Sequence, residues 1–391
     1  MARRYPLQDQ VAFVGVGESA YARDRGRSAL GLTVEACVDA VRDAGVDPAD
    51  IDGIAGSTSG PPAHVVQSAL GIPECRWWVN APIPFTQQVI EAANAVFSGA
   101  CEVALVYHTT YRNAGSSQSA AQDPFRARAA THSGSSGPDG VDGVVGYAAW
   151  ASRYLHEYDL GRSDLALVAL NGRANAVRNE HAVMRQPLTM EEYLAGRMIR
   201  EPLCVYDMDL PVDGADAFIV TTAERARTMS PPPVLIHAAS LGQTDRPEED
   251  QVLDLERTGQ SVVVDALWER SELELDDMDL FYPYDGFSII TLRWLESVGY
   301  CGSGEAPDIL RASWSDSEGR VLLTGRVPVN THGGSLSDGG TQGSGHVRES
   351  VRQLRGDAGA HQVTGARHAL LTLGGFFFNA GGLLLRSAEW S

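Results

Sequence analysis

The feature that most constrains the fold is an order of strand-like and helix-like segments that occurs twice along the chain. The first copy has a strand-like "VAFVGVGESAY" ending in a glycine turn, a helical "TVEACVDAVRDAGV" and a strand-like "IDGIAG". From Pro231 the order begins again, with "PPPVLIHAASLG" and "SVVVDALWERSELELDDMDLFYPYD". Apolar residues recurring at three and four predict helices, and short apolar runs closed by glycine predict buried strands. The pattern indicates an internal duplication, although chance similarity between two strand–helix units is the alternative.

Later segments extend the correspondence. "TQQVIEAANAVFSG" and "GSGHVRESVRQLRG" are both helical and both close on a glycine before a strand, at residues 103–107 and 369–373. Strands that alternate with helices of this length predict a mostly parallel sheet covered on both faces. We therefore expect an N-terminal half over residues 1–230 and a C-terminal half over residues 231–391.

An insertion at about residues 112–200 interrupts the first half. Residues 113–141 are rich in Gly, Ser, Ala and Gln, which predicts a mobile loop. Helical patterns follow at about 146–158 and 164–179 and in "TMEEYLAGRM". Long insertions of this kind usually shape a binding site. The C-terminal "HALLTLGGFFFNAGGLLLR" predicts two buried strands joined by a turn and no membrane span, because glycine pairs interrupt it.

Charge and cysteine usage exclude several classes of function. A formal net charge of −19 disfavours nucleic acid and anionic membranes as partners. All 31 basic residues are arginine, so a lysine Schiff base is excluded. The five cysteines form no C-x-x-C pair, which favours a reducing cytoplasm, and the N-terminal apolar stretch is too short for a signal segment.

Three long segments carry a resemblance to a known family. They are "YAAWASRYLHEYDLGRSDLALVALNGRANAVRNEHA", "LTMEEYLAGRMIREPLCVYDMDLPVDGADAFIV" and "NTHGGSLSDGGTQGSGHVRESVRQLRG". On these residues the chain resembles the lipid-transfer-protein-like branch of the thiolase superfamily, over almost its whole length. The resemblance implies an α/β fold of five αβαβα layers, built from two duplicated βαβαβαββ halves, and a homodimer.

The catalytic pattern of that family is changed in this chain. The place of the nucleophilic cysteine falls at Pro82, and the place of the second catalytic cysteine falls near Thr372 and Leu373. Where carrier-type relatives have His-Asp-x-Phe, this chain has "YDGF" from Tyr284, and "GGT" from Gly339 replaces their Gly-His-Pro. Covalent acyl transfer therefore lacks its nucleophile.

The remaining pattern resembles the steroid side-chain aldolases of this branch, in which a tyrosine replaces that histidine. The resemblance implies retro-aldol cleavage of a β-hydroxyacyl-CoA, which needs a base, donors for the thioester enolate and an acid, but no cofactor. Tyr284 is the first candidate for acid or base, with Asp285 orienting the site. Tyr282 is less favoured than Tyr284. Strand alternation places these two residues on the same face of the strand, unless Pro283 bends the chain. The alternative is that both tyrosines only pack, with their hydroxyls satisfied.

A second proton carrier is needed, and its identity is open. Some relatives of this aldolase class carry a second tyrosine near the place of Gly340. His332, His346 and Asp338 are the candidates here, with His332 ahead because its loop lines the active site in the family. His346 begins a helix whose dipole favours the neutral imidazole, but a satisfied surface histidine is the alternative for it.

The glycine-rich loop, residues 333–345, is the expected substrate-binding segment. Its glycines allow close backbone approach and can present N–H donors to a thioester oxygen. We expect this role for Gly333, Gly334, Gly340 and Gly343. No H-x-H or H-E-x-x-H motif occurs, so no metal site is expected.

Two other functions compete with the lyase. The chain could be a non-catalytic, thiolase-like subunit that binds acyl-CoA or serves as a scaffold in a larger complex. An acyl transferase using Ser57, Thr58 or Thr86 is weaker, since no G-x-S-x-G elbow is present. The resemblance also implies a partner, a small OB-fold and zinc-ribbon protein.

Overall fold

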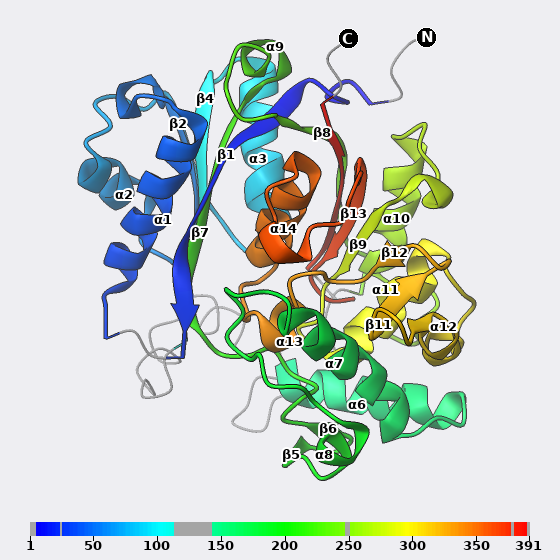
Figure 1. Ribbon diagram of the computed structural model, residues 1–391. Coiled ribbons are helices and arrows are strands. Elements are labelled where there is room, and N and C mark those ends of the chain that lie inside the picture. The colour runs from blue at the N-terminus through cyan, green and yellow to red at the C-terminus, as the bar shows by residue number, and fades with distance from the viewer. Residues whose placement is uncertain (1–4, 24–25, 113–142, 247–250, 377–378, 389–391) are drawn as a thin grey trace.

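Nine strands form one sheet whose two halves repeat the same strand order (Figure 1). The computed structural model describes residues 5–23, 26–112, 143–246, 251–376 and 379–388. The order across the sheet is β3-β2-β4-β7-β1-β8-β14-β13-β9. The two halves meet at a short antiparallel pairing of β1 with β8.

Each half places its first strand at the centre and its last strand next to it. The first half consists of β1 (Val11–Ala22), β2 (Gly53–Ser57), β3 (Trp77–Ala81), β4 (Val103–Tyr111) and β7 (Asp213–Thr222). The second half consists of β8 (Val234–Gly242), β9 (Leu280–Pro283), β13 (His368–Leu373) and β14 (Ala380–Ser387). Outward from the centre, β1-β7-β4-β2 matches β8-β14-β13-β9, which confirms the duplication. The counterpart of β3 is reduced to an isolated parallel bridge between Phe281 and Val329.

Helices complete five layers. The outer faces are covered by α1 (Ala29–Ala44) and α2 (Ala63–Leu70) in the first half, and by α10 (Gly259–Glu269) and α11 (Ser288–Val298) in the second. Between the halves lie α3 (Phe85–Ser98) and α14 (Ser344–Arg355), each in contact with strands of both halves (Figure 1). The expected thiolase-like αβαβα arrangement is confirmed. The expectation of a mostly parallel sheet is wrong: among the described strands of this sheet only β2–β3, β2–β4 and β9–β13 pair in parallel, and the other neighbours are antiparallel, because β7 and β14 return beside the first strand of each half.

The glycines of "VGVG" have a role that the pattern did not reveal. The strand does not end there, because β1 continues to Ala22. A Cβ atom on Gly15 would lie 2.4 Å from the Ala40 carbonyl oxygen, and one on Gly17 would lie 2.4 Å from that of Ala36. These glycines allow α1 to pack directly against the strand backbone.

The insertion forms a helical layer below the sheet in Figure 1. The expected helices are present as α6 (Gly143–Glu157), α7 (Arg162–Ala176) and α8 (Met190–Leu194), and the loop expected over residues 113–141 lies outside the described residues. Short elements complete this region. They are β5 (Met198–Arg200), β6 (Leu203–Cys204), α12 (Ala306–Ala312), β10 (Trp314–Ser315), β11 (Arg320–Leu323), β12 (Val327–Pro328) and α13 (Gly334–Ser337). The boundary placed after residue 230 falls between α9 (Ala223–Ala226) and β8, in a short connection.

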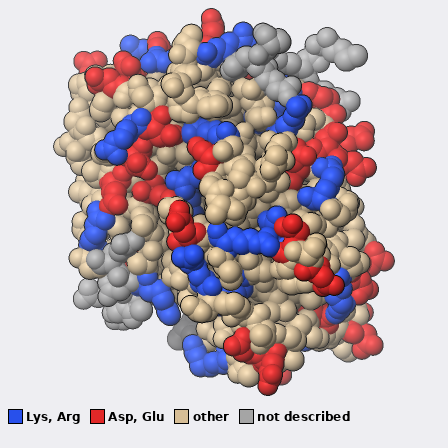
Figure 2. Space-filling model, viewed as in Figure 1, with Lys and Arg blue, Asp and Glu red and all other residues tan. Residues whose placement is uncertain are grey.

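The C-terminal apolar segment forms the antiparallel pair β13 and β14, as predicted. Within the described ranges, no helix combines the length and the apolar character that crossing a bilayer requires. On the face shown in Figure 2, arginines and acidic side chains are interspersed, and no large area carries positive charge alone.

Candidate active site

Four rings form a row at the end of β9. The strand pairing continues past Pro283, because the Tyr284 N–H donates to the Thr372 carbonyl at 2.7 Å. Tyr282 and Tyr284 therefore face the same side, as strand alternation predicts. Their ring centroids lie 6.0 Å from His332 and 5.9 Å from His346, and the two imidazoles lie 4.7 Å apart.

Tyr284 is nearly buried, but its surroundings are charged. Its side chain belongs to a residue only 6% exposed. Burial raises the pKa of the Tyr284 phenol well above 10, the Asp209 carboxylate raises it further, and Arg112 acts in the opposite direction. The phenol is consequently protonated at neutral pH, which suits an acid better than a base.

Asp285 connects residues 282–286, called the tyrosine segment here, to the glycine-rich loop. One carboxylate oxygen accepts the Ser335 N–H at 2.7 Å and lies 3.2 Å from Nε2 of His346. The other accepts the Leu336 N–H at 3.3 Å, so Asp285 anchors the start of α13. His346 is fully buried, and the alternative of a surface histidine is wrong.

Tyr282 belongs to a separate polar chain. Its hydroxyl lies 2.9 Å from Oγ1 of Thr331, which donates to Glu349. Glu349 in turn lies 3.1 Å from Nε2 of His361. The Tyr282 hydroxyl is thus already engaged within the chain, which agrees with the packing alternative for this residue.

His332 lies beside these polar groups and is held neutral. Burial lowers its pKa well below the usual value, and the neighbouring His346 and Arg348 act in the same direction. Its Nδ1 has no hydrogen-bond partner among the described residues. A neutral imidazole can accept a proton only weakly in this environment.

Asp338 lies in a buried ion network rather than beside Tyr284. Arg348 donates to Asp338 at 2.6 Å and to Asp216 at 2.7 Å, and it lies 3.0 Å from Glu18. Burial raises the pKa of Asp338 to about 6, although Arg348 opposes the shift. This carboxylate is already committed to Arg348, so its role as a second proton carrier is not favoured.

Two of the four expected substrate-binding glycines do not offer free donors. The N–H of Gly333 donates to the Asn330 carbonyl at 2.9 Å, and that of Gly340 donates to the Leu210 carbonyl at 2.8 Å. The oxyanion role expected for these two backbone groups is therefore corrected. Both Gly334 and Gly343 have positive φ, of 66° and 97°, which favours glycine at these turns.

Comparison with known proteins identifies the architecture. Residues 243–387 match the family described as thiolase C-terminal domain-like. The chain is 33% identical to a 17-hydroxy-3-oxo-4-pregnene-20-carboxyl-CoA lyase of Mycobacterium tuberculosis, with coverage of 94% of this chain and 97% of that protein. It belongs to the thiolase superfamily.

Two further relatives place this thiolase-superfamily chain in the lipid-transfer-protein-like branch. It is 31% identical to a steroid side-chain-cleaving aldolase of Thermomonospora curvata, with coverage of 94% of this chain and 96% of that protein. A solved structure described as "Ltp2-ChsH2(DUF35) aldolase" has a TM-score of 0.86 and 29% identity, and the match covers 98% of this chain and 100% of that chain.

Segments near the places where the sequence analysis put the thiolase catalytic residues lie close together in this chain. The Phe85 N–H, at the start of α3, donates to the Gln342 carbonyl of the glycine-rich loop at 3.2 Å. Tyr284 pairs with Thr372, and a Cβ atom on Gly374 would lie 3.4 Å from Cβ of Pro84. The scaffold thus brings together segments that are distant in sequence, around an altered set of side chains.

No cysteine of the chain is activated as a thiolate nucleophile. All five are free thiols, and burial raises the pKa of each. For Cys101 and Cys301 the pKa is about 12. A raised pKa is the opposite of what a catalytic cysteine needs.

Sequence reasoning missed the pair Arg112 and Asp209. Arg112 follows β4 and donates to Oδ2 of Asp209, whose side chain is 12% exposed. The signal was present in "DMDLPVDG", because an aspartate between apolar residues in a loop needs a partner when buried. Its partner could not be found in the sequence, since 97 positions separate the two residues.

Two other features lie away from Tyr284. A cavity of about 480 Å³ is lined by α1, α14 and residues 178–181 and 357–361, but not by Tyr284 or Asp285.

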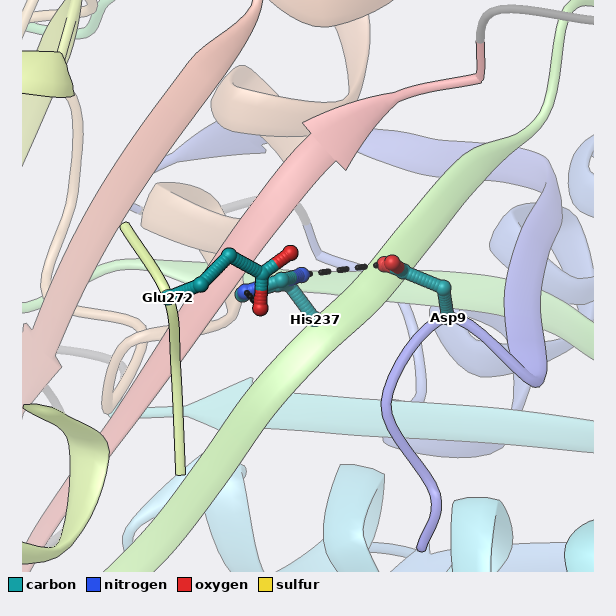
Figure 3. A group of neighbouring side chains, drawn as sticks. All are labelled: Asp9, His237 and Glu272. Carbon is teal, nitrogen blue, oxygen red and sulfur yellow. Dashed lines mark hydrogen bonds and ion pairs between the residues drawn. The ribbon is translucent and has the colours of Figure 1, made fainter. Parts of the chain in front are cut away.

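His237, Asp9 and Glu272 form the cluster drawn in Figure 3. Nδ1 of His237 lies 3.1 Å from Asp9, while Nε2 lies 2.9 Å from Ser271 and 3.5 Å from Glu272. The ring thus joins the N-terminal segment to the second half, with both nitrogens already engaged.

Proposed function

We propose that this chain is a carbon–carbon lyase that cleaves a β-hydroxyacyl-CoA by a retro-aldol reaction. The observation that carries the proposal is Tyr284, a protonated phenol set among Asp209, Arg112 and Asp285 at the end of β9. The raised thiol pKa values disfavour acyl transfer through a cysteine nucleophile.

The reaction divides into two proton transfers around one bond cleavage. A base removes the β-hydroxyl proton, the Cα–Cβ bond breaks, and the bond electrons form the thioester enolate while the β-carbon becomes a ketone or aldehyde. An acid then protonates Cα and releases a shorter acyl-CoA. Tyr284 supplies this second proton, because its neutral form is the one that burial favours. Asp285 acts by positioning His346 and α13, and no cofactor is required.

A bulky acyl chain, such as a steroid side chain, is the proposed substrate class. The support is the similarity over nearly the whole chain to proteins named for steroid side-chain cleavage. Gly334 and Gly343 remain the proposed substrate-binding glycines, at turns whose positive φ favours glycine.

The test is direct turnover by the full chain. We expect 17-hydroxy-3-oxo-4-pregnene-20-carboxyl-CoA, added to the purified protein, to yield a steroid ketone and a shorter acyl-CoA in equal amounts, measured by chromatography. Tight binding of the thioester without product, alone and with its partner present, would instead support a non-catalytic acyl-CoA-binding or scaffold subunit. That alternative is considered because the residues at the expected thiolase catalytic places have changed.

The chain is proposed to work as a homodimer with a small OB-fold and zinc-ribbon partner. The strand β3 is an open edge of the sheet, and its Trp78 is 62% exposed, which suits pairing with a second copy. The partner is supported by a similar structure described as "Ltp2-ChsH2(DUF35) aldolase". Five free thiols suit a reducing cytoplasm.

A further inference from the structure

The segment that carries Asp209 lies between the two loops of the site. The Asp209 N–H donates to the Gly286 carbonyl at 2.9 Å, two residues after Tyr284. The Leu210 N–H donates to the Ser335 carbonyl at 2.9 Å, and the Leu210 carbonyl accepts the Gly340 N–H at 2.8 Å. Three backbone hydrogen bonds therefore fix Asp209 between the tyrosine segment and the glycine-rich loop.

The Asp209 carboxylate occupies the space that a side chain at position 340 would need. A Cβ atom built on Gly340 would lie 2.6 Å from Oδ2 of Asp209 and 2.9 Å from the Leu210 carbonyl oxygen. Real Cβ atoms do not approach other atoms so closely, so the backbone at 340 and the carboxylate can coexist only with glycine there. The polar group at this place comes from another segment of the chain.

Arg112 holds one oxygen of this carboxylate. Its guanidinium donates to Oδ2 of Asp209, which leaves Oδ1 without a hydrogen-bond partner in the part of the chain that the structure describes. The second oxygen of this carboxylate can accept a hydrogen bond from a hydroxyl group. Tyr284 lies close enough for its titration to depend on both Asp209 and Arg112.

We propose that Asp209, held by Arg112, is the second acid–base group of the retro-aldol site and acts as its catalytic base. Asp209 accepts the β-hydroxyl proton as the Cα–Cβ bond breaks and the β-carbon becomes the carbonyl. The Tyr284 hydroxyl donates its proton to Cα of the enolate. The proton on Asp209 then passes to the Tyr284 phenolate, so that one proton is taken, one is given and the site is restored. This inference rests on the proposed function.

The competing explanation is that Arg112 and Asp209 form a purely structural pair at the end of β4. Four variants of the full chain separate the two: Asp209→Asn, Asp209→Glu, Asp209→Ala and, as a control, Asp265→Asn. Asp265 forms a comparable but exposed pair with Arg257, 2.8 Å apart and over 60% exposed on both sides. Steady-state ketone release from 17-hydroxy-3-oxo-4-pregnene-20-carboxyl-CoA gives kcat and KM, and thermal melting reports folding.

We expect Asp209→Asn to lower kcat by about 10²- to 10⁴-fold with KM within about threefold, since a lost general base typically has this effect. Asp209→Glu should recover part of kcat, added formate should partly rescue Asp209→Ala, and Asp265→Asn should match the wild type. Rescue by formate distinguishes a missing base from a misfolded site even if Asp209→Asn melts early.

Two results would overturn the inference in different ways. Suppose that the wild type turns over the substrate. The base role alone would then be refuted if Asp209→Asn had an unchanged kcat. It would also be refuted if formate did not rescue Asp209→Ala and Asp209→Glu recovered no kcat. Absence of ketone release by the wild type, both alone and with its partner present, would refute the proposed function and this inference together.

Discussion

The central helices α3 and α14 hold equivalent places in the two halves, but only α14 buries ionisable side chains. Both end at a glycine of positive φ, Gly99 and Gly356. Aligned on these glycines, α3 presents apolar residues where α14 presents ionisable ones. Two buried pairs are Val89 with His346 and Ala92 with Glu349.

The difference shows where a duplicated scaffold can hold chemistry. Most of the buried residues of α3 are apolar, and such packing stabilises by about 25 cal/mol per Å² removed from water. Burying α14 needs a partner for every charge, because an unpaired buried ion costs several kcal/mol. The second half therefore holds a connected polar network, and the candidate acid Tyr284 lies beside it at the end of β9.

The largest expected effect concerns Tyr284. Replacing Tyr284 with Phe should lower kcat for retro-aldol cleavage by about 10²- to 10⁴-fold, because the proton donor is lost while the ring still packs. The matched variant in the first half is Tyr107→Phe, whose hydroxyl donates to the Pro61 carbonyl at 2.6 Å. It should lose about 1 kcal/mol of stability and no activity. Equal turnover in both variants would show that the halves do not differ in this way.

The next effect is on stability and concerns Arg348. Its replacement by Met leaves Glu18, Asp216 and Asp338 without their shared cation, which should cost about 3–5 kcal/mol in the free energy of unfolding. Urea denaturation gives the value. Glu91 holds the aligned position in α3, is only partly buried, and its replacement by Met should change stability by about 0.5 kcal/mol or less. Similar losses in both variants would remove the contrast between the helices.

A third effect depends on pH and joins the halves, since Glu18 of β1 contacts α14. Burial would raise the pKa of Glu18, but Arg348 and Arg352 outweigh it and hold the pKa at about 2, below its ordinary 4.5. Because the pKa of Glu18 is lower in the folded than in the unfolded protein, its ionised form stabilises the fold by about 3 kcal/mol above pH 4.5. This stabilisation is lost as the pH falls toward 2.

Glu18→Gln should therefore be less stable than the wild type at pH 7, with the gap closing as the pH falls below 4.5. Denaturant unfolding at several pH values measures it. Glu35→Gln, which removes an exposed pair with Arg27 on the first half, provides the control and should give a nearly constant small difference. A gap for Glu18→Gln that stays constant with pH would contradict the ion-pair assignment.

The smallest effect concerns Gly340. A methyl group at this position would contact Asp209 at 2.6 Å, so Gly340→Ala should cost about 1–3 kcal/mol and displace the carboxylate. Gly161, whose Cβ position has no atom nearer than 4.0 Å, should accept alanine with little change. Thermal melting of the two variants tests this, and equal melting temperatures would mean that the loop at 340 relaxes freely.

Much of the fold could be predicted, and less of the site. The repeated order of elements and the glycine-closed helices are local patterns, so they identified the halves and the strand pair at the C-terminus. Tyr284, Asp285, His332 and His346 were found together because two short segments carry them. Asp209 and Arg112 were missed, and the exposure expected as the alternative for His346 was wrong, because burial and long-range pairing leave little trace in local sequence.

The sequence by itself determined the duplicated strand and helix order and the absence of lysine chemistry. These are properties of residue identity and period, which a single chain displays. Only the tertiary structure decided which polar groups meet: Arg112 with Asp209, Arg348 with three carboxylates, and Gly340 with the space that Asp209 fills. The physical reason is that protonation and ion pairing depend on distance and burial, and both arise when segments far apart in sequence pack together.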